Sequence, residues 1–187
     1  MEKTFYLNSA FETKRIKNSN GLKIAGYANT TDKDRVGDVV TAQAWAKGVA
    51  NYRKNPVLLY QHKHDQPIGK VDKVTVDKKG IYVDAMVSDA AEKLHGVQTL
   101  IKDGALKSFS VGFRVKDGKY DAHNDSMNIT EVELLEISVV SVPANQNSLF
   151  SVRKSFEGDS EYEEFVKSFK NGESEEEIDT EDNTIEE

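Results

Sequence analysis

Apolar and polar residues alternate along much of the chain between residues 21 and 140, and this period of two restricts the fold more than any other feature of the sequence. The alternation is most regular in KSFSVGFRV, where Phe109, Val111 and Phe113 fall on one side of a strand. Other segments predicted as strands are GLKIAGYAN, SMNITEVELLEISVVSVPAN and the hairpin IGKVDKVTVDKKGIYVDAMVS. Successive strands with short turns favour a mainly β (α+β) fold, a closed or strongly bent antiparallel β-barrel flanked by a few helices.

Two segments have the period of a helix. TAQAWAKGVANYRKN carries apolar residues at helical spacing, and the Asn-Pro pair that follows ends the helix. DAAEKLHGVQTLIKDG is predicted as one further helix, with Leu94, Val97 and Ile101 on its apolar face. Asp89 is the expected N-cap of this helix, and Gly104 lies past its end.

Charge divides the chain near residue 150. The net charge is −7, but residues 151–187 carry 14 acidic and four basic side chains, whereas residues 1–150 carry 18 acidic and 21 basic ones. The last 17 residues contain too few apolar groups to offset the entropy cost of ordering. We therefore expect an N-terminal extension over 1–20, a folded domain over 21–150 and a mostly disordered acidic tail over 151–187. Within the tail, SEYEEFVKSFK can form a short amphipathic helix, either packed on the domain or transient.

The composition excludes several classes of site. The chain has no cysteine, which excludes disulfides, thiolate metal ligands and a cysteine nucleophile. Its first 20 residues lack the apolar core of a signal peptide, and no stretch approaches the roughly 18 apolar residues of a membrane span. We expect a soluble, intracellular protein.

Two of the four histidines lie close together in LLYQHKHDQPIG, directly after an apolar strand. His62 and His64 have a spacing that places both rings on one face of a strand, where they could begin a metal site. Nothing in the spacing selects a third ligand among Asp65, Asp38 and His95. The alternative, one surface histidine beside one at the edge of the core, therefore stays open.

Two other segments could act together with a histidine. In KSFSVGFRV the side opposite the apolar one carries Ser110, Gly112 and Arg114, although an ordinary solvated strand face has the same pattern. Glu136 is a single acid within the run LLEISVV, where a carboxylate is costly to bury unless it is paired or faces water at a sheet edge. A serine nucleophile needs an adjacent base, and the base needs its second ring nitrogen held. The residue types for nucleophilic catalysis are present, but spacing along the chain cannot show that His62, Ser110 and Glu136 meet.

The order of four motifs resembles that of the prohead (capsid-maturation) proteases of tailed phages. The motifs are GYANTTDKDRVGDVV, NPVLLYQHKHDQPIGKV, LKSFSVGFR and ELLEISVVSVPANQNS. In that family a His precedes Pro-Ile-Gly, a Ser lies in a Ser-aliphatic-Gly-aromatic motif, and an acid-aliphatic-Ser strand ends in Pro-Ala-Asn. The similarity runs from about Gly21 to Ser148 and leaves out the acidic tail.

The resemblance implies a serine endopeptidase with a β-barrel like that of the herpesvirus assembly proteases and with no cofactor or metal. It implies that Ser110 is the nucleophile, His62 the general base and Glu136 the third catalytic residue. The related herpesvirus enzymes use a second histidine, so the third role has rivals. These rivals are His64, His95 and Asp38.

The resemblance also implies where and on what the enzyme acts. Its expected partners are the phage major capsid protein and/or the scaffold protein, inside the assembling procapsid in the host cytoplasm. We further expect self-cleavage and a homo-oligomer, with no nucleic-acid or membrane partner. One alternative is an inactive capsid or scaffold component of the same fold, although the presence of both His62 and Ser110 argues against it. The other is a metal-dependent hydrolase, which lacks a third committed ligand.

Overall fold

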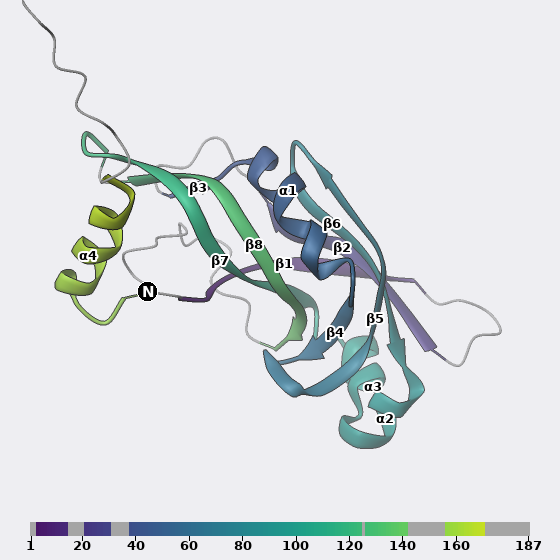
Figure 1. Ribbon diagram of the computed structural model, residues 1–187. Helices are drawn as coiled ribbons and strands as arrows, with labels where there is room; N and C mark the ends of the chain where they lie inside the picture. Colours follow the sequence, from purple (N-terminus) through teal and green to yellow (C-terminus); the bar gives the residue numbers. More distant parts are fainter. Residues whose placement is uncertain (1–2, 15–20, 31–37, 125, 142–155, 171–187) are drawn as a thin grey trace, which may run out of the picture.

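The strands form one sheet that closes on itself. The computed structural model describes residues 3–14, 21–30, 38–124, 126–141 and 156–170 (Figure 1). Within them the strand order is β3-β8-β4-β5-β6-β2-β1-β7, and β7 also pairs with β8. The strands are β1 (Phe5–Lys14), β2 (Gly21–Thr30), β3 (Val39–Val40), β4 (Val57–Tyr60), β5 (Lys63–Asp77), β6 (Gly80–Ser88), β7 (Ser108–Asp121) and β8 (Ser126–Val140). The predicted closed barrel is confirmed.

One pairing in the ring is parallel. β4 runs parallel to β8, as the short strand β3 does outside the ring, whereas the other pairings around the barrel are antiparallel. Because β3 and β4 both run parallel to β8, on its two sides, they also run in the same direction as each other and need a crossover connection. The helix α1 (Ala42–Tyr52) supplies it, because it follows β3, packs on β8 and leads into β4. The parallel pair was not expected from the sequence.

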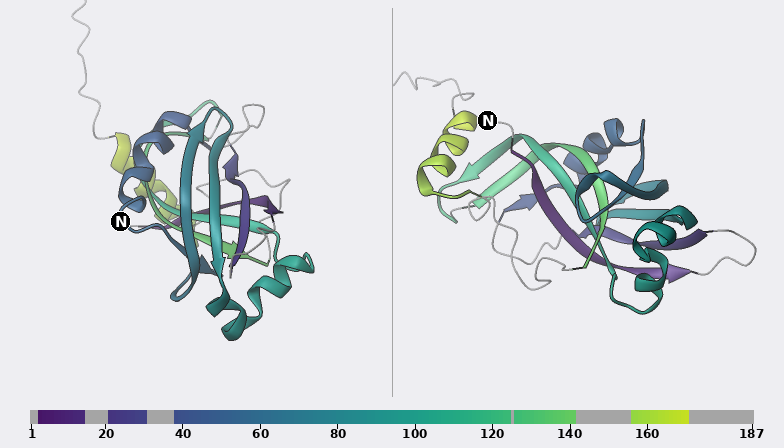
Figure 2. Two further views of the ribbon diagram at one scale, coloured as in Figure 1. Left: turned by 90° about the vertical axis from the view of Figure 1, so that its right-hand side faces the viewer. Right: turned by 90° about the horizontal axis from the view of Figure 1, so that it is seen from below.

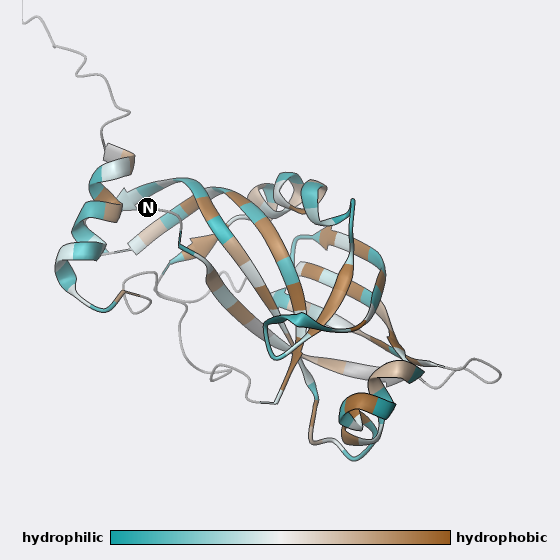
Figure 3. Ribbon diagram, turned by 60° about the horizontal axis from the view of Figure 1, so that its bottom comes forward, coloured by the Kyte–Doolittle hydropathy of each residue, from teal (hydrophilic) through white to brown (hydrophobic). Residues whose placement is uncertain are grey.

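Alternation builds the core as predicted. On β7, Phe109, Val111 and Phe113 are fully buried, and hydrophobic and hydrophilic bands alternate along β7 and β8 (Figure 3). The predicted helix over TAQAWAKGVANYRKN is confirmed as α1, with Trp45 and Val49 fully buried. No helix among the described residues has the length and apolar character needed to cross a bilayer.

The second predicted helix is two helices. α2 (Asp89–His95) and α3 (Val97–Lys102) are separated at Gly96, whose φ of 60° lies in the left-handed region that favours glycine. The N-cap of α2 is Ser88, since its Oγ accepts a hydrogen bond from the Ala90 N–H at 3.2 Å. Leu94 is 70% exposed, because the break at Gly96 removes it from the buried face that α3 presents.

The N-terminal strand belongs to the barrel. Residues 1–20 are expected from the sequence as an extension, yet β1 pairs with β7 through its first part and with β2 through its last part. Phe5 and Phe11 are buried and Leu7 packs against the core, so FYLNSAFETK has the same period of two as the other strands. The expected extension therefore includes the strand that joins β2 to β7 and closes the ring.

A helix from the expected tail packs on the domain. α4 (Asp159–Lys170) contacts β7 and lies at the opposite end of the barrel from α2 and α3 (Figure 2). The ring of Phe165 lies 5.8 Å from that of Phe5 and 5.2 Å from that of Phe156, and all three side chains are buried. SEYEEFVKSFK is therefore a packed helix, and the expected tail begins later than residue 151. The remainder of that tail, residues 151–155 and 171–187, lies outside the described residues.

Replacing Phe165 by alanine should destabilise the protein by about 3 kcal/mol, because it removes a buried ring that contacts β1. Urea unfolding followed by circular dichroism measures this change. Glu164→Ala, an exposed change on the same helix, should stay within about 0.5 kcal/mol of wild type. Equal stability of the two variants would show that α4 contributes nothing to the fold.

Candidate active site

The imidazole of His62 is hydrogen bonded to the carboxylate of Glu136. His62 Nδ1 lies 2.7 Å from Glu136 Oε1. An ionised carboxylate can only accept, so Nδ1 carries the proton and Nε2 of the neutral ring is left as an acceptor. Glu136 is only 4% exposed and the His62 side chain is 27% exposed. The single acid in the apolar run is thus buried and paired, rather than facing water at a sheet edge.

His62 lies in a strained turn that β8 holds in place. Gln61 and His62 have φ angles of 53° and 60°, a left-handed conformation that costs a non-glycine residue about 1–3 kcal/mol. The Gln61 N–H donates to the Val139 carbonyl at 3.0 Å, and the His62 N–H donates to Ser138 Oγ at 3.2 Å. Both restraints come from the strand that carries Glu136, so β8 holds the backbone of His62 close to the Glu136 carboxylate.

The hydroxyl of Ser138 links the Glu136 carboxylate to the backbone of His62. It donates to Glu136 Oε2 at 2.5 Å and accepts from the His62 backbone N–H. Ser138 is fully buried and lies two residues after Glu136, which puts both side chains on the same face of β8. Both carboxylate oxygens of Glu136 are therefore engaged, Oε1 by the ring and Oε2 by the hydroxyl.

The register of β7 on β8 puts Ser110 beside this pair. Gly112 is the partner of Glu136 and Ser110 is the partner of Ser138. The carboxylate lies over Gly112, since a Cβ added there would come within 2.5 Å of Glu136 Oε1. Ser110 and Gly112 are two residues apart, hence on one face and about 7 Å apart along the strand. The register then shifts so that Phe113 pairs with Leu134, which leaves Leu135 as the extra residue of a bulge next to the site.

The Ser110 hydroxyl is buried on this face of β7. Ser110 and Ser108 are fully buried, and among the described residues neither Oγ has a hydrogen-bond partner. This face of β7 is therefore not the solvated strand face that the sequence left open. An unsatisfied buried hydroxyl costs free energy, and such groups in a folded protein call for an explanation. One such explanation is that the hydroxyl takes part in a chemical reaction.

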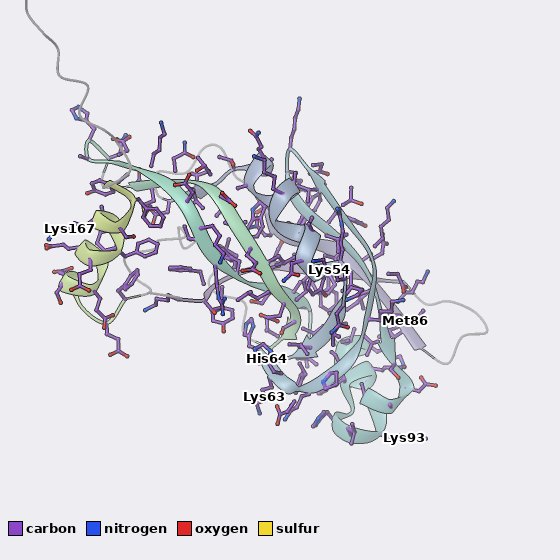
Figure 4. The ribbon with its side chains drawn as sticks, viewed as in Figure 1. Lys54, Lys63, His64, Met86, Lys93 and Lys167 are labelled. Carbon is purple, nitrogen blue, oxygen red and sulfur yellow. The ribbon has the colours of Figure 1, made fainter. Side chains whose placement is uncertain are left out.

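The other candidate residues lie elsewhere. His64 is exposed on β5, beside Lys63 at the outer edge of the molecule (Figure 4). The ring of His95 stacks on Tyr60 with centroids 5.5 Å apart. The Asp38 carboxylate accepts a hydrogen bond from the Met127 N–H. Met127 lies nine residues before Glu136 on β8, so Asp38 is roughly 30 Å from Glu136 along the strand. No group of three or more His, Asp or Glu side chains in the described part of the chain could hold a metal ion.

Two side chains at this site, Ser138 and Tyr6, are not predicted from the sequence. Ser138 could have been found, since its spacing from Glu136 places it on the same face. Tyr6 on β1 had no such signal, because its strand was expected as an extension. Its ring centroid lies 4.2 Å from that of His62, and partial burial, together with the negative charge of Glu136, raises the pKa of the Tyr6 phenol above its usual value. The phenol is therefore uncharged at neutral pH.

A closed barrel that carries a histidine–carboxylate pair beside a buried strand serine has the parts of a serine hydrolase. The family model of the caudovirus prohead serine proteases matches residues 9–161. Over 150 residues the chain is 43% identical to the prohead protease of Escherichia phage T5, covering 79% of this chain and 70% of that protein. It belongs to the caudovirus prohead serine protease family, whose members are serine proteases of phage capsid maturation.

Two further relatives are similar in sequence, and one solved structure is similar in fold. The prohead protease of Enterobacteria phage HK97 is 30% identical over 138 residues, 71% of this chain and 60% of that protein. The capsid polyprotein of Pseudomonas phage PAJU2 is 30% identical over 158 residues, 80% of this chain but 23% of that protein. The structure of the bacteriophage T4 capsid assembly protease has the same fold, with a TM-score of 0.60 at 13% identity over 76% of this chain and 99% of that one.

Gly112→Ala should lower the reactivity of the site by about 10-fold or more, because the added methyl group displaces the Glu136 carboxylate and, with it, the His62 ring. The rate at which a serine-directed fluorophosphonate labels the protein measures this reactivity. Gly158→Ala is the matched control, since a Cβ added there comes no closer than 4.0 Å to any atom of the described residues. Unchanged labelling of folded Gly112→Ala would contradict the described position of the carboxylate.

Proposed function

We propose that Ser110 is the nucleophile, His62 the general base and Glu136 the residue that orients the base, in an endopeptidase of procapsid maturation. The observation that carries the proposal is the 2.7 Å bond from His62 Nδ1 to Glu136 Oε1. It leaves Nε2 to act on the serine, whose strand is the direct neighbour of the strand that carries the carboxylate. The strained turn at His62 adds support, because such strain gathers at functional sites.

The proposed reaction follows the order of an acyl transfer. Ser110 Oγ attacks the carbonyl carbon of the scissile peptide while His62 Nε2 takes its proton. The imidazolium that forms is stabilised by the negative charge of Glu136, and it then gives the proton to the leaving amine. Water, with His62 again as base, attacks the acyl-enzyme and restores the Ser110 hydroxyl. Ser138 holds Glu136 and the His62 backbone in place during both acylation and deacylation.

The proposed substrates are the scaffold protein or the scaffold-like segment of the coat protein, inside the procapsid in the host cytoplasm. Two names among the relatives support this: one is a capsid assembly protease, and another is a capsid polyprotein that contains a segment similar to this chain. We further propose a homo-oligomer that also cleaves itself at a bond somewhere on the C-terminal side of Phe150. Packing of α4 on β7 favours a cut outside residues 156–170, because a docked helix is a poor protease substrate.

An inactive capsid component of the same fold is the second candidate. The observation that favours it is the full burial of Ser110, since a nucleophile must be reached by its substrate. A fluorophosphonate separates the two candidates, because it forms a bond only with a serine that an adjacent base activates. Covalent labelling of Ser110 supports the protease, and the absence of labelling supports the inactive component.

Ser110→Ala and His62→Ala should each abolish cleavage of the co-expressed coat protein and of the chain itself. The double variant should be little worse than either single one, because the two residues act as a unit. Intact-mass measurement of both proteins over time gives the result: wild type shortens at its C-terminal end and Ser110→Ala keeps its full mass. Normal coat-protein cleavage by Ser110→Ala would contradict the assignment of Ser110 as the nucleophile. Equal shortening of wild type and Ser110→Ala would show that a contaminating protease makes the cut.

Glu136→Gln should slow cleavage by about 10- to 10⁴-fold, since an amide still bonds to the ring but cannot stabilise the imidazolium. His64→Ala is the control and should cleave at the wild-type rate, because His64 is exposed on β5. The initial rate of coat-protein cleavage is the measurement. Full activity of Glu136→Gln, with loss of activity in His64→Ala or His95→Ala, would move the third role to a histidine.

A further inference from the structure

Three residues form one row across the barrel beneath the His62 ring. Tyr6 on β1 is the partner of Gly112 on β7, and Gly112 is in turn the partner of Glu136 on β8. Residues directly opposite one another on adjacent strands point to the same face of a sheet. Because Gly112 has no side chain, the Glu136 carboxylate can lie over the middle of this row. The backbones of the two outer members are about 10 Å apart, across two strand spacings.

The His62 imidazole contacts both outer members of the row. Its Nδ1 lies 2.7 Å from Glu136 Oε1, and its ring centroid lies 4.2 Å from that of Tyr6, with the planes tilted by 54°. The ring thus has a hydrogen bond on one side and an aromatic surface on the other. It belongs to a turn that reaches the row from β4, so neither contact is made by a sequence neighbour.

The hydrogen bond alone does not fix the direction of Nε2. Small combined changes in χ1 and χ2 can still tilt a histidine ring that is held at one nitrogen, and such tilting moves Nε2 toward or away from β7. A packed aromatic ring limits this tilting by van der Waals contact over its surface. Tyr6 is the described aromatic residue that makes this contact, and its 46% exposure fits a side chain at the rim of a site.

We propose that Tyr6 is a positioning residue for His62, whose ring holds the imidazole in the plane that directs Nε2 toward Ser110. This inference rests on the proposed function of Ser110 and His62. Tyr6 precedes residue 9, where the match to the family model begins, so the role belongs to a part of the chain that the family match does not include. The N-terminal strand then has two roles, because it closes the barrel and completes the site.

The proposal separates the ring of Tyr6 from its hydroxyl. Contact with His62 needs the aromatic surface alone, so Tyr6→Phe should behave as wild type, whereas Tyr6→Ala removes the contact. Leu7→Ala is the matched control on the same strand, because Leu7 packs against the core on the opposite face. It should lower the free energy of unfolding without altering the chemistry of the folded protein.

The test is the kinetics of labelling by a fluorophosphonate, measured with the full chain at several probe concentrations. In this reaction Ser110 Oγ forms a bond to phosphorus, fluoride leaves and His62 takes the serine proton. Tyr6→Ala should lower the maximal labelling rate by about 10- to 100-fold, the range expected when a base is misdirected rather than removed. Probe affinity should change by less than about threefold, since Tyr6 acts on the step and not on binding.

The outcomes are distinguishable. Loss of the maximal rate in Tyr6→Ala, rescue in Tyr6→Phe and a wild-type rate in folded Leu7→Ala support the proposal. Labelling of Tyr6→Ala at the wild-type rate overturns the proposal and leaves the proposed function intact. An equal loss of the maximal labelling rate in Leu7→Ala also overturns it, because the effect would then belong to strand β1 as a whole. A wild-type protein that is not labelled at Ser110 overturns the proposed function and this inference with it.

Discussion

The pairing of β7 with β8 is the constraint on which the barrel and the site both depend. It runs from Ser108↔Val140 to Asp121↔Ser126 and closes the sheet into a ring. The same register that turns Phe109 and Val111 into the core turns Ser110 toward the face of Glu136. A shift of one residue would exchange the two faces of a strand, burying polar groups and exposing apolar ones. The stability of the core therefore also protects the geometry of the site.

Burying Glu136 sets a second condition on the structure. An isolated carboxylate in an apolar strand is strongly disfavoured, and hydrogen bonds to both of its oxygens reduce that cost. The His62 ring and the Ser138 hydroxyl supply these bonds, and the Ser138 hydroxyl also accepts from the His62 backbone. Breaking any one of these contacts leaves a buried polar group unsatisfied. Such a closed network explains how a left-handed turn at two non-glycine residues is tolerated.

Local pattern predicted the elements whose form depends on their own residues. The alternation in KSFSVGFRV predicted β7 and the face that it turns to the core, and helical spacing predicted α1. The order of motifs singled out His62, Ser110 and Glu136, although spacing alone could not bring them together. The split at Gly96 was missed because it depends on one left-handed residue inside a continuous apolar period.

Elements that depend on distant partners were harder to predict. The docking of α4 relies on Phe5, at the other end of the chain. The residues of β1 are expected from the sequence as an extension, although Phe5, Leu7 and Phe11 have the period of a strand. Tyr6 could not be assigned to the site without the register of β1 on β7. Its contact with His62 exists only in the closed barrel.

A crystal structure of the protein after reaction with a fluorophosphonate tests the central claim most directly. The account predicts a covalent bond from Ser110 Oγ to phosphorus, with His62 Nε2 within hydrogen-bond distance of Ser110 Oγ or of an oxygen of the adduct. His62 Nδ1 should still be bonded to Glu136. An adduct on another residue, or an imidazole whose Nε2 points away from Ser110 in the labelled protein, would contradict it.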